Sequence, residues 1–278
     1  MMKKQKIYSD LIDEQLELSS ELSFGKLTKL AKYDVKKFEF HIDNEILAQK
    51  LGKEMGHYTT INCSQLFVHL KKVQDYISDC LSETISKFLS RASKKKKPLV
   101  LVVGLGNNSI VADSLGTKVT EKLVSTTQMP KELCKEMGKL CFLNAGVGGQ
   151  TGITSFDIIE SITKKLKPDV LIVVDALTTK DFKRLGCSFQ VSDSGITPGA
   201  GVKNYLKTLN KQTLGCEVIA VGVPVMITGF GLCENIKSNL KNKVFTPKEV
   251  DIYTDKCSYV LAKAINKSVH KNGYTNYY

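Results

Sequence analysis

The feature that most constrains the fold is the alternation of apolar runs and helical patterns between residues 99 and 223. The predicted order is strand 99–103, helix 114–126, strand 140–144, helix 155–166, strand 170–174, strand 188–191 and strand 218–222. Strands that alternate with helices form βαβ units with parallel strands and right-handed crossovers. We therefore predict an α/β fold: a largely parallel, twisted sheet flanked by helices.

The segments on either side add two long helices. Apolar residues at three- and four-residue spacing predict an amphipathic helix over 64–89, with Ser64 as its N-cap. A second helix is expected over 247–270, because Thr246-Pro-Lys-Glu249 has the pattern of a capping box with proline at the first helical position. Short strands are expected at 38–42 and 59–62.

No internal repeat or low-complexity linker divides the chain, so we expect one domain over residues 1–278. Within it we distinguish an amino-terminal elaboration (1–97), a motif-bearing core (98–225) and a carboxy-terminal helical part (226–278).

The apolar stretches and the cysteines indicate the cellular compartment of the protein. No apolar stretch approaches the roughly 20 residues that span a bilayer, and the amino terminus has no apolar signal core. The eight cysteines show no CxxC and no metal-type spacing, which is typical of free thiols in a reducing cytoplasm. We therefore expect a cytoplasmic protein that makes no membrane contact and needs no cofactor.

The net charge of +12 raises the question of nucleic acid. The one dense basic run, Lys94–Lys97, lies between a helical pattern and a strand and is most simply a solvated connector. No basic stripe is interleaved with aromatic residues, so nucleic acid is not expected as a direct partner. A positive surface could equally attract an acidic protein or peptide.

Two aspartates stand just past apolar runs that are predicted to be strands. Asp113 follows the run that begins at Leu99, and Asp175 follows Val170-Leu-Ile-Val-Val. In open parallel sheets, ligands and catalytic groups collect at the carboxyl ends of strands. Two carboxylates that meet there could share a proton and carry out acid–base chemistry.

Glycine-rich segments follow the same strands. Gly104-Leu-Gly-Asn-Asn108 resembles a dinucleotide fingerprint, but Ser109 stands where a third glycine is needed. A turn that positions Asn107 and Asp113 is the better interpretation.

A second segment, Asn144–Gly152, is either a flexible loop or a pocket wall. If it is a pocket wall, its backbone N–H groups line the pocket, and Gln150 and Thr151 bind substrate.

The triplet Asp193-Ser-Gly195 matches the signature of pepsin-like and retroviral aspartic proteases. Pepsin-like enzymes are all-β and carry the triplet twice, and the retroviral type is a dimer of small β subunits. We therefore expect Asp193 to cap or brace the glycine-rich loop that follows it, with a direct role in the site as the alternative.

Taken in order, these motifs closely resemble the germination protease family of spore-forming bacteria. The resemblance is dense over residues 98–225, and Tyr8–Ile12 faintly resembles an Arg-Thr-Asp-Leu-Ala segment of that family. The motifs that carry it are Gly104–Asn107 with Asp113–Gly116, Gly149–Ile153, Lys167–Leu177, Ser192–Gly201 and Leu214–Pro224.

The resemblance implies an endopeptidase that begins the degradation of small acid-soluble spore proteins during germination, in the forespore or spore core. It also implies a zymogen, a homotetramer, and a fold similar to that of the hydrogenase maturation peptidases. The family's essential aspartates correspond to Asp113 and Asp175. We expect these two to hold a water between them, with Asn107 and the N–H groups around Gly148 and Gly149 stabilising the oxyanion.

Some positions depart from the family pattern and leave alternatives open. Ser114 stands where the hydrogenase maturation peptidases carry a metal-binding Glu, and all four histidines lie outside the motif core, so no metal is expected. At most seven residues precede Tyr8, so we expect zymogen control to be absent or altered. The alternatives are a metal-dependent maturation-type peptidase and a non-catalytic paralogue that binds spore proteins.

Overall fold

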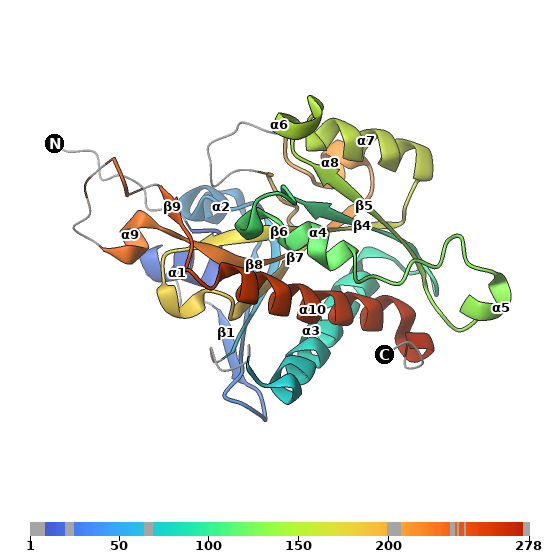
Figure 1. Ribbon diagram of the computed structural model, residues 1–278, viewed down its shortest axis with the longest axis horizontal. Coiled ribbons are helices and arrows are strands. Elements are labelled where there is room, and N and C mark those ends of the chain that lie inside the picture. The colour runs from blue at the N-terminus through green and yellow to red at the C-terminus, as the bar shows by residue number, and fades with distance from the viewer. Residues whose placement is uncertain are drawn as a thin grey trace.

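The chain builds a mixed nine-stranded sheet, shown in Figure 1. The computed structural model describes residues 9–19, 25–63, 69–198, 207–233, 237, 239–241 and 243–274. The sheet runs in the order β1-β2-β3-β7-β8-β6-β4-β5, and β9 pairs with β8. The strands are β1 (Lys26–Lys29), β2 (Lys36–Ile42), β3 (Gly56–Asn62), β4 (Leu99–Leu105), β5 (Lys139–Gly146), β6 (Val170–Thr179), β7 (Ser188–Ser192), β8 (Glu217–Thr228) and β9 (Val244–Phe245).

The prediction of parallel strands holds for the inner part of the sheet. β5, β4, β6 and β8 are parallel neighbours, whereas β1, β2, β3, β7 and β9 pair antiparallel. A parallel connection needs a crossover of a dozen or more residues. Only a short 3₁₀ turn, η4 (Phe182–Arg184), separates β6 from β7, so β7 returns antiparallel to the parallel strands.

Helices cover both faces of the sheet, which places the protein in the predicted α/β class. The α-helices are α1 (Ile12–Ser19), α2 (Glu45–Leu51), α3 (Lys71–Ala92), α4 (Leu115–Thr120), α5 (Lys131–Cys134), α6 (Gly148–Thr151), α7 (Ser155–Leu166), α8 (Lys211–Leu214), α9 (Gly229–Leu232) and α10 (Val250–His270). Two further 3₁₀ turns are η3 (Val111–Asp113) and η6 (Lys271–Tyr274).

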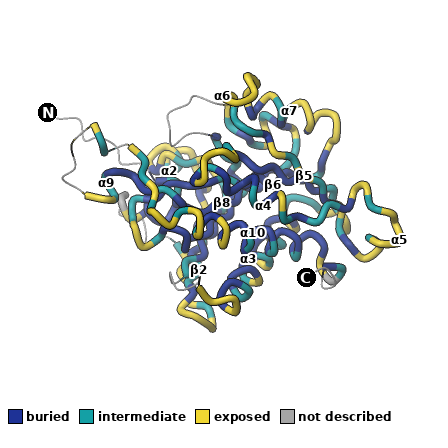
Figure 2. The backbone as a smooth tube through the Cα atoms, in the orientation of Figure 1, coloured by how far each residue is buried: buried dark blue, intermediate teal, exposed yellow. Residues whose placement is uncertain are grey.

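Two apolar cores lie on opposite faces of the parallel strands. Val100 and Val102 of β4 face the core that holds α3 and α10, which lie side by side in Figure 1. Leu101 and Val103 face the other core, to which α7 contributes Phe156. This alternation is the period of two that a strand imposes, and it leaves β4, β6 and β8 almost entirely buried in Figure 2.

Several predicted boundaries need correction. Helix 155–166 coincides with α7, but the helix predicted over 114–126 ends at Thr120. The helix predicted over 64–89 begins at Lys71 within the described residues, and the proposed N-cap, Ser64, lies outside them.

The predicted capping box at Thr246 is wrong. α10 begins at Val250, and Glu249 stands at its N-cap without a side-chain capping bond. The Val250 N–H instead donates to the Pro247 carbonyl at 3.2 Å, so these residues form a turn ahead of the helix.

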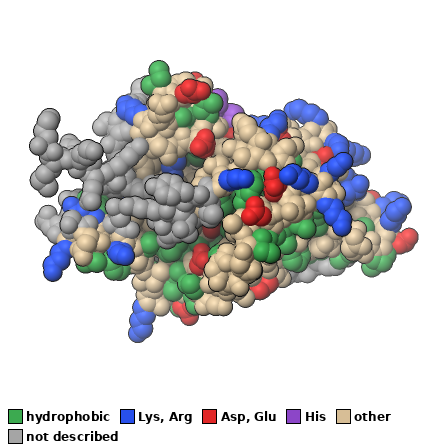
Figure 3. Space-filling model, turned by 90° about the horizontal axis from the view of Figure 1, so that it is seen from above, with side chains coloured by type: hydrophobic (Ala, Val, Ile, Leu, Met, Phe, Trp, Pro, Cys, Tyr) green, Lys and Arg blue, Asp and Glu red, His purple; other side chains and the backbone are tan. Residues whose placement is uncertain are grey.

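None of the helices within the described residues is both long enough and apolar enough to cross a membrane. On the face shown in Figure 3, Lys and Arg side chains are most frequent toward the end of the molecule where α5 lies, in keeping with the net charge of +12.

Candidate active site

A cavity of about 680 Å³ opens beside the carboxyl ends of the parallel strands. Both predicted catalytic residues, Asp113 and Asp175, line it, and so do the predicted Gly148 and Gly149. Asp113 comes from the segment after β4, and Asp175 comes from β6. These two strands are parallel neighbours in the sheet. The sheet therefore brings together the pair of residues that the sequence places far apart.

Asp113 is held by a tight turn after β4. The Asn107 N–H donates to Asp113 Oδ2 at 2.8 Å, across the bend that Gly106 makes with a φ of +104°. A Cβ at Gly106 would lie 1.9 Å from the Asp113 carbonyl oxygen. The glycine is thus required both by its backbone conformation and by the close approach of Asp113.

A second close approach presses the segment that carries Asp113 onto the sheet. A Cβ at Gly116, in the first turn of α4, would lie 2.4 Å from the Leu105 carbonyl oxygen and 2.6 Å from that of Val174. These are backbone atoms of β4 and β6, which cannot move aside independently. The missing side chain at Gly116 lets Asp113 approach the part of β6 next to Asp175.

The sequence predicted that Asp175 lies just past the end of a strand. In the structure it lies inside β6. The pairing of β4 with β6 ends at Val174, while β6 continues beside β8 as far as Thr179. Asp175 is therefore the first residue of β6 beyond the edge of β4. Its partner on β8 is Gly222, and its Oδ1 accepts the Ala176 N–H at 2.9 Å.

The two aspartates differ in electrostatic environment. Burial, together with the nearby carboxylates of Asp10 and Asp113, raises the pKa of Asp175 to about 7 against the opposing effect of the hydrogen bond from the Ala176 N–H. Burial also raises the pKa of Asp113, against the opposing effect of the hydrogen bond from the Asn107 N–H. Both shifts favour the protonated form, and Asp175 is the carboxyl group with the larger shift.

Three predicted substrate-binding side chains are engaged with one another or with their own loop, outside the cavity lining. Asn107 Oδ1 accepts the Ser109 N–H at 2.8 Å and Gln150 Nε2 at 2.6 Å. Thr151 Oγ1 donates to the Ile153 carbonyl at 2.9 Å. Asn107 and Gln150 therefore tie the loop after β4 to α6, whose Gly148 and Gly149 do line the cavity.

Asp193 also lies outside the cavity lining. Its Oδ1 accepts the His57 N–H at 2.6 Å, and its Oδ2 lies 3.0 Å from His57 Nδ1. The described contacts of Asp193 thus brace the start of β3 rather than the following loop, part of which lies outside the described residues. Its neighbour Ser194 is the member of the triplet that lines the cavity together with Gly195.

Three charged residues of the cavity wall, Asp10, Lys53 and Glu54, were missed by the sequence analysis. Asp10 precedes α1, and Lys53 follows α2; both line the cavity with the aspartate pair. Asp10 falls within the Tyr8–Ile12 segment whose faint family resemblance was the one available signal. Lys53 lies in a stretch without a motif, where spacing carries no information about the fold.

The donor set for a metal ion is poor. Within the ranges that the structure describes, no three His, Cys, Asp or Glu residues form a group that could hold a metal. Ser114 is buried, and its hydroxyl donates to the Val111 carbonyl at 2.8 Å. The position where a maturation peptidase would supply a carboxylate therefore supplies a structural hydrogen bond.

Comparisons with known proteins agree with the motifs. A family model described as germination protease matches residues 3–239. A germination protease of Clostridium tetani is 30% identical over 94% of this chain and 94% of its own length. Those of a Geobacillus species and of Bacillus velezensis are 37% and 39% identical, over 65% of this chain but only half of their own length.

Among solved structures, the chain is similar to the [NiFe] hydrogenase maturation protease HycI of Thermococcus kodakarensis. The TM-score is 0.37 and the sequence identity 20%, with 62% of this chain and 94% of the other covered. The family match over most of the chain, together with a full-length relative at 30% identity, shows that this chain belongs to the germination protease family.

Proposed function

We propose that this protein is an endopeptidase that begins the degradation of small acid-soluble spore proteins during germination, through a two-aspartate acid/base mechanism. The observation that carries the proposal is the pair of Asp113 and Asp175 in the wall of one cavity, with the pKa of Asp175 raised to about 7. A carboxylic acid and a carboxylate side by side are the acid and base that peptide hydrolysis needs.

In this mechanism a water molecule lies between the two side chains. Ionised Asp113 accepts a proton from the water while the water oxygen bonds to the scissile carbonyl carbon. Protonated Asp175 donates its proton to the carbonyl oxygen, and a proton then passes from Asp113 to the leaving amine. No covalent bond to the protein forms, and both carboxyl groups recover their starting states when the C–N bond breaks and a hydroxyl of the tetrahedral intermediate gives its proton to Asp175, which leaves the new carboxyl product.

The start of α6 supplies candidate donors to the developing oxyanion. The first N–H groups of a helix precede its internal hydrogen bonds. In α6 the Gln150 N–H is the one that closes onto the Val147 carbonyl, at 2.9 Å, and Gly148 and Gly149 come before it. Their N–H groups at the cavity wall support the role predicted for them.

The proposal includes the substrate, the compartment and the assembly. A net charge of +12 favours encounter with acidic proteins or peptides. Action on spore proteins would require the protein to reside in the forespore or spore core. The homotetramer proposed by family resemblance can be measured by light scattering on the purified chain.

The test is to incubate the purified protein with a small acid-soluble spore protein and to identify the products by mass spectrometry. The proposal predicts discrete internal fragments. Removal of a carboxy-terminal peptide from a metalloenzyme precursor, dependent on added metal, would instead indicate a maturation-type peptidase. Stable binding of the spore protein without cleavage would indicate a non-catalytic paralogue.

A further inference from the structure

The edge of β6 that faces β4 opens into the cavity at one residue. β4 pairs with β6 only as far as Val174, whereas β8 pairs with the other edge of β6 as far as Thr179. Within the described residues, no strand pairs with β6 on the β4 side beyond Val174. Ala176, two residues past this point, lines the cavity beside Asp175. A strand edge without a neighbour is a place where another main chain can bind.

The backbone groups of successive strand residues point to alternate edges, which fixes the direction of the Ala176 carbonyl. Gly222 of β8 is the partner of Asp175, and a Cβ at Gly222 would lie 2.8 Å from the Asp175 carbonyl oxygen, so that carbonyl faces β8. The Val174 carbonyl faces the other way, because its oxygen would lie 2.6 Å from a Cβ at Gly116 in α4. Ala176 has the parity of Val174, so its carbonyl faces the open edge.

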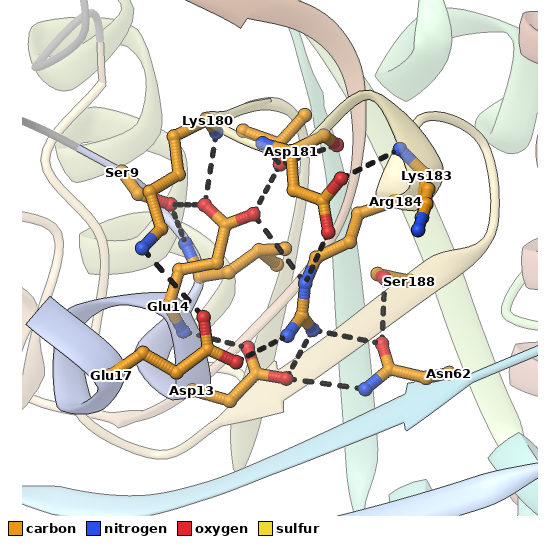
Figure 4. A network of polar contacts seen from close by, with 12 residues as sticks. Ser9, Asp13, Glu14, Glu17, Asn62, Lys180, Asp181, Lys183, Arg184 and Ser188 are labelled. Carbon is orange, nitrogen blue, oxygen red and sulfur yellow. Dashed lines mark hydrogen bonds and ion pairs between the residues drawn. The ribbon is translucent and has the colours of Figure 1, made fainter. Parts of the chain in front are cut away.

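The next residues of the same parity have partners in the described part of the chain. The Thr178 carbonyl accepts the Asp10 N–H at 3.0 Å. The Lys180 N–H donates to the Glu14 carboxylate at 3.0 Å, as Figure 4 shows. The edge beyond Ala176 therefore already binds main-chain and carboxylate groups from elsewhere in the chain, and the position of Ala176 itself faces the cavity.

A carbonyl in this position calls for a hydrogen-bond donor. Ala176 is only 9% exposed, and buried backbone carbonyls are almost always hydrogen-bonded. The Ala176 N–H already donates to Asp175 Oδ1 at 2.9 Å. The carbonyl is thus the acceptor that this edge offers to the cavity, and the main-chain N–H of an extended peptide is the donor that strand edges bind.

We propose that the Ala176 carbonyl positions the substrate by accepting a main-chain N–H from an extended segment of the spore protein, which adds to the open edge of β6. The proposal rests on the proposed endopeptidase function and specifies how its substrate is held. Consecutive Cα atoms lie about 3.8 Å apart, so the substrate residue bonded to Ala176 lies beside the Asp175 carboxyl group, at or next to the scissile bond. A segment held in a helix would have to unfold first, because its N–H groups are bonded internally.

The test follows the Ala176 carbonyl itself. The Ala176 side chain belongs to the core that holds α3 and α10, so its replacement would alter packing rather than the carbonyl. The dipeptide Ala176-Leu177 occurs once in the sequence, and so does Ala264-Ile265 in α10. Full-length protein labelled with carbonyl-13C alanine and with 15N leucine and isoleucine therefore gives one HNCO signal for each dipeptide.

The labelled protein carries Asp113→Asn to prevent cleavage and is titrated with a small acid-soluble spore protein. The 13C signal of the Ala176 carbonyl should move downfield as it accepts the hydrogen bond. The Ala264 signal is the internal control and should stay in place, because Ala264 is fully buried in α10. An Ala176 signal that does not move at saturation, or an equal movement of both signals, would overturn the proposal.

A second measurement uses the wild-type protein and synthetic peptides that span the cleavage site. In each peptide one amide outside the scissile bond is replaced by an ester, which removes a single N–H and keeps the length of the chain. One position beside the scissile bond should lose about 10-fold in kcat/KM, the usual effect of one hydrogen bond. The same ester peptide should bind labelled Asp113→Asn without moving the Ala176 signal. Equal rates for all peptides, or an ester at the sensitive position that still moves the signal, would refute the proposed bond.

Failure of this proposal is distinguishable from failure of the proposed function. Wild-type protein whose Ala176 signal moves when the spore protein is added, but which leaves the spore protein uncut, would support the docking and refute the endopeptidase function. Cleavage without movement of the Ala176 signal, and with equal rates for every ester peptide, would refute the docking alone.

Discussion

The surroundings of Asp175 make its side chain a much weaker acid than an ordinary aspartate. Asp175 lines the cavity, and burial together with the carboxylates of Asp10 and Asp113 raises its pKa to about 7. Such shifts cluster at functional sites because catalysis needs acids and bases poised near the working pH. The chemistry of this protein is therefore expected to depend on how the Asp175 proton is held.

The first consequence is a pH dependence of the rate. If Asp175 must be protonated and Asp113 ionised, kcat/KM should rise with pH as Asp113 ionises and fall above pH of about 7 as Asp175 loses its proton. Measurement of initial cleavage rates across pH 4 to 9 in buffers of constant ionic strength tests this. A rate that keeps rising through pH 9 would contradict the assignment of Asp175 as the acid.

The second consequence concerns stability. The pKa of Asp175 is raised from 3.8 to about 7 on folding, so the native state binds this proton more tightly than the unfolded state. The stabilisation is complete below the unfolded value and is lost as pH rises through about 7. The Asp175→Asn side chain cannot ionise, so the variant does not lose this stability at high pH. The Tm of the variant minus the Tm of the wild type should therefore grow as pH rises from 4 to 8. A Tm difference that does not change with pH would exclude a buried, titrating Asp175.

At the scale of the secondary structure elements, the close packing of α4 on β4 and β6 positions the site. Gly116→Ala should destabilise the protein by about 1–3 kcal/mol, because its Cβ would meet backbone atoms of Leu105 and Val174. Gly149→Ala is the matched comparison: a Cβ there meets nothing within 4 Å, so its stability should change little. Urea denaturation followed by circular dichroism measures both, and equal losses in the two variants would contradict this packing argument.

The sequence predicted the elements better than their ends. The apolar run of β6 stops at Val174, but the strand continues because β8 pairs with it to Thr179, and that pairing has no local signature. α3 was expected from periodicity and α10 from a capping-box pattern, yet the first residue of α10 depends on the turn closed by the Pro247 carbonyl. Local patterns specify which face is buried, whereas neighbouring elements decide where each one begins and ends.

The site was predictable in part for the same reason. Asp113 and Asp175 each follow an apolar run, in a recognisable order, so the predicted topology places both at the same edge of the sheet. Asp10 and Lys53 reach the cavity from segments that precede the parallel strands: Asp10 through hydrogen bonds with Thr178 and Gln190, and Lys53 through the bond from its Nζ to the Asp10 carbonyl. No spacing in the chain indicates such long-range contacts.

For the whole molecule, the account requires no metal ion. Carboxylates and backbone N–H groups line the cavity, and Ser114 makes a structural hydrogen bond where a metal ligand would be needed. Prolonged dialysis against EDTA should leave the rate of spore-protein cleavage within about twofold of the untreated rate, well below the effect of losing a catalytic group. Loss of activity that zinc or nickel restores would contradict a two-aspartate mechanism.

The most direct test of the central claim is the rate at which Asp113→Asn and Asp175→Asn cleave a small acid-soluble spore protein at pH 6.5. Asparagine preserves size and removes the acid or base, so both variants should fold like the wild type and lose at least about 100-fold in kcat/KM. Mass spectrometry of the digests, with circular dichroism to verify folding, gives the answer. Cleavage by folded Asp175→Asn at the wild-type rate would contradict the account.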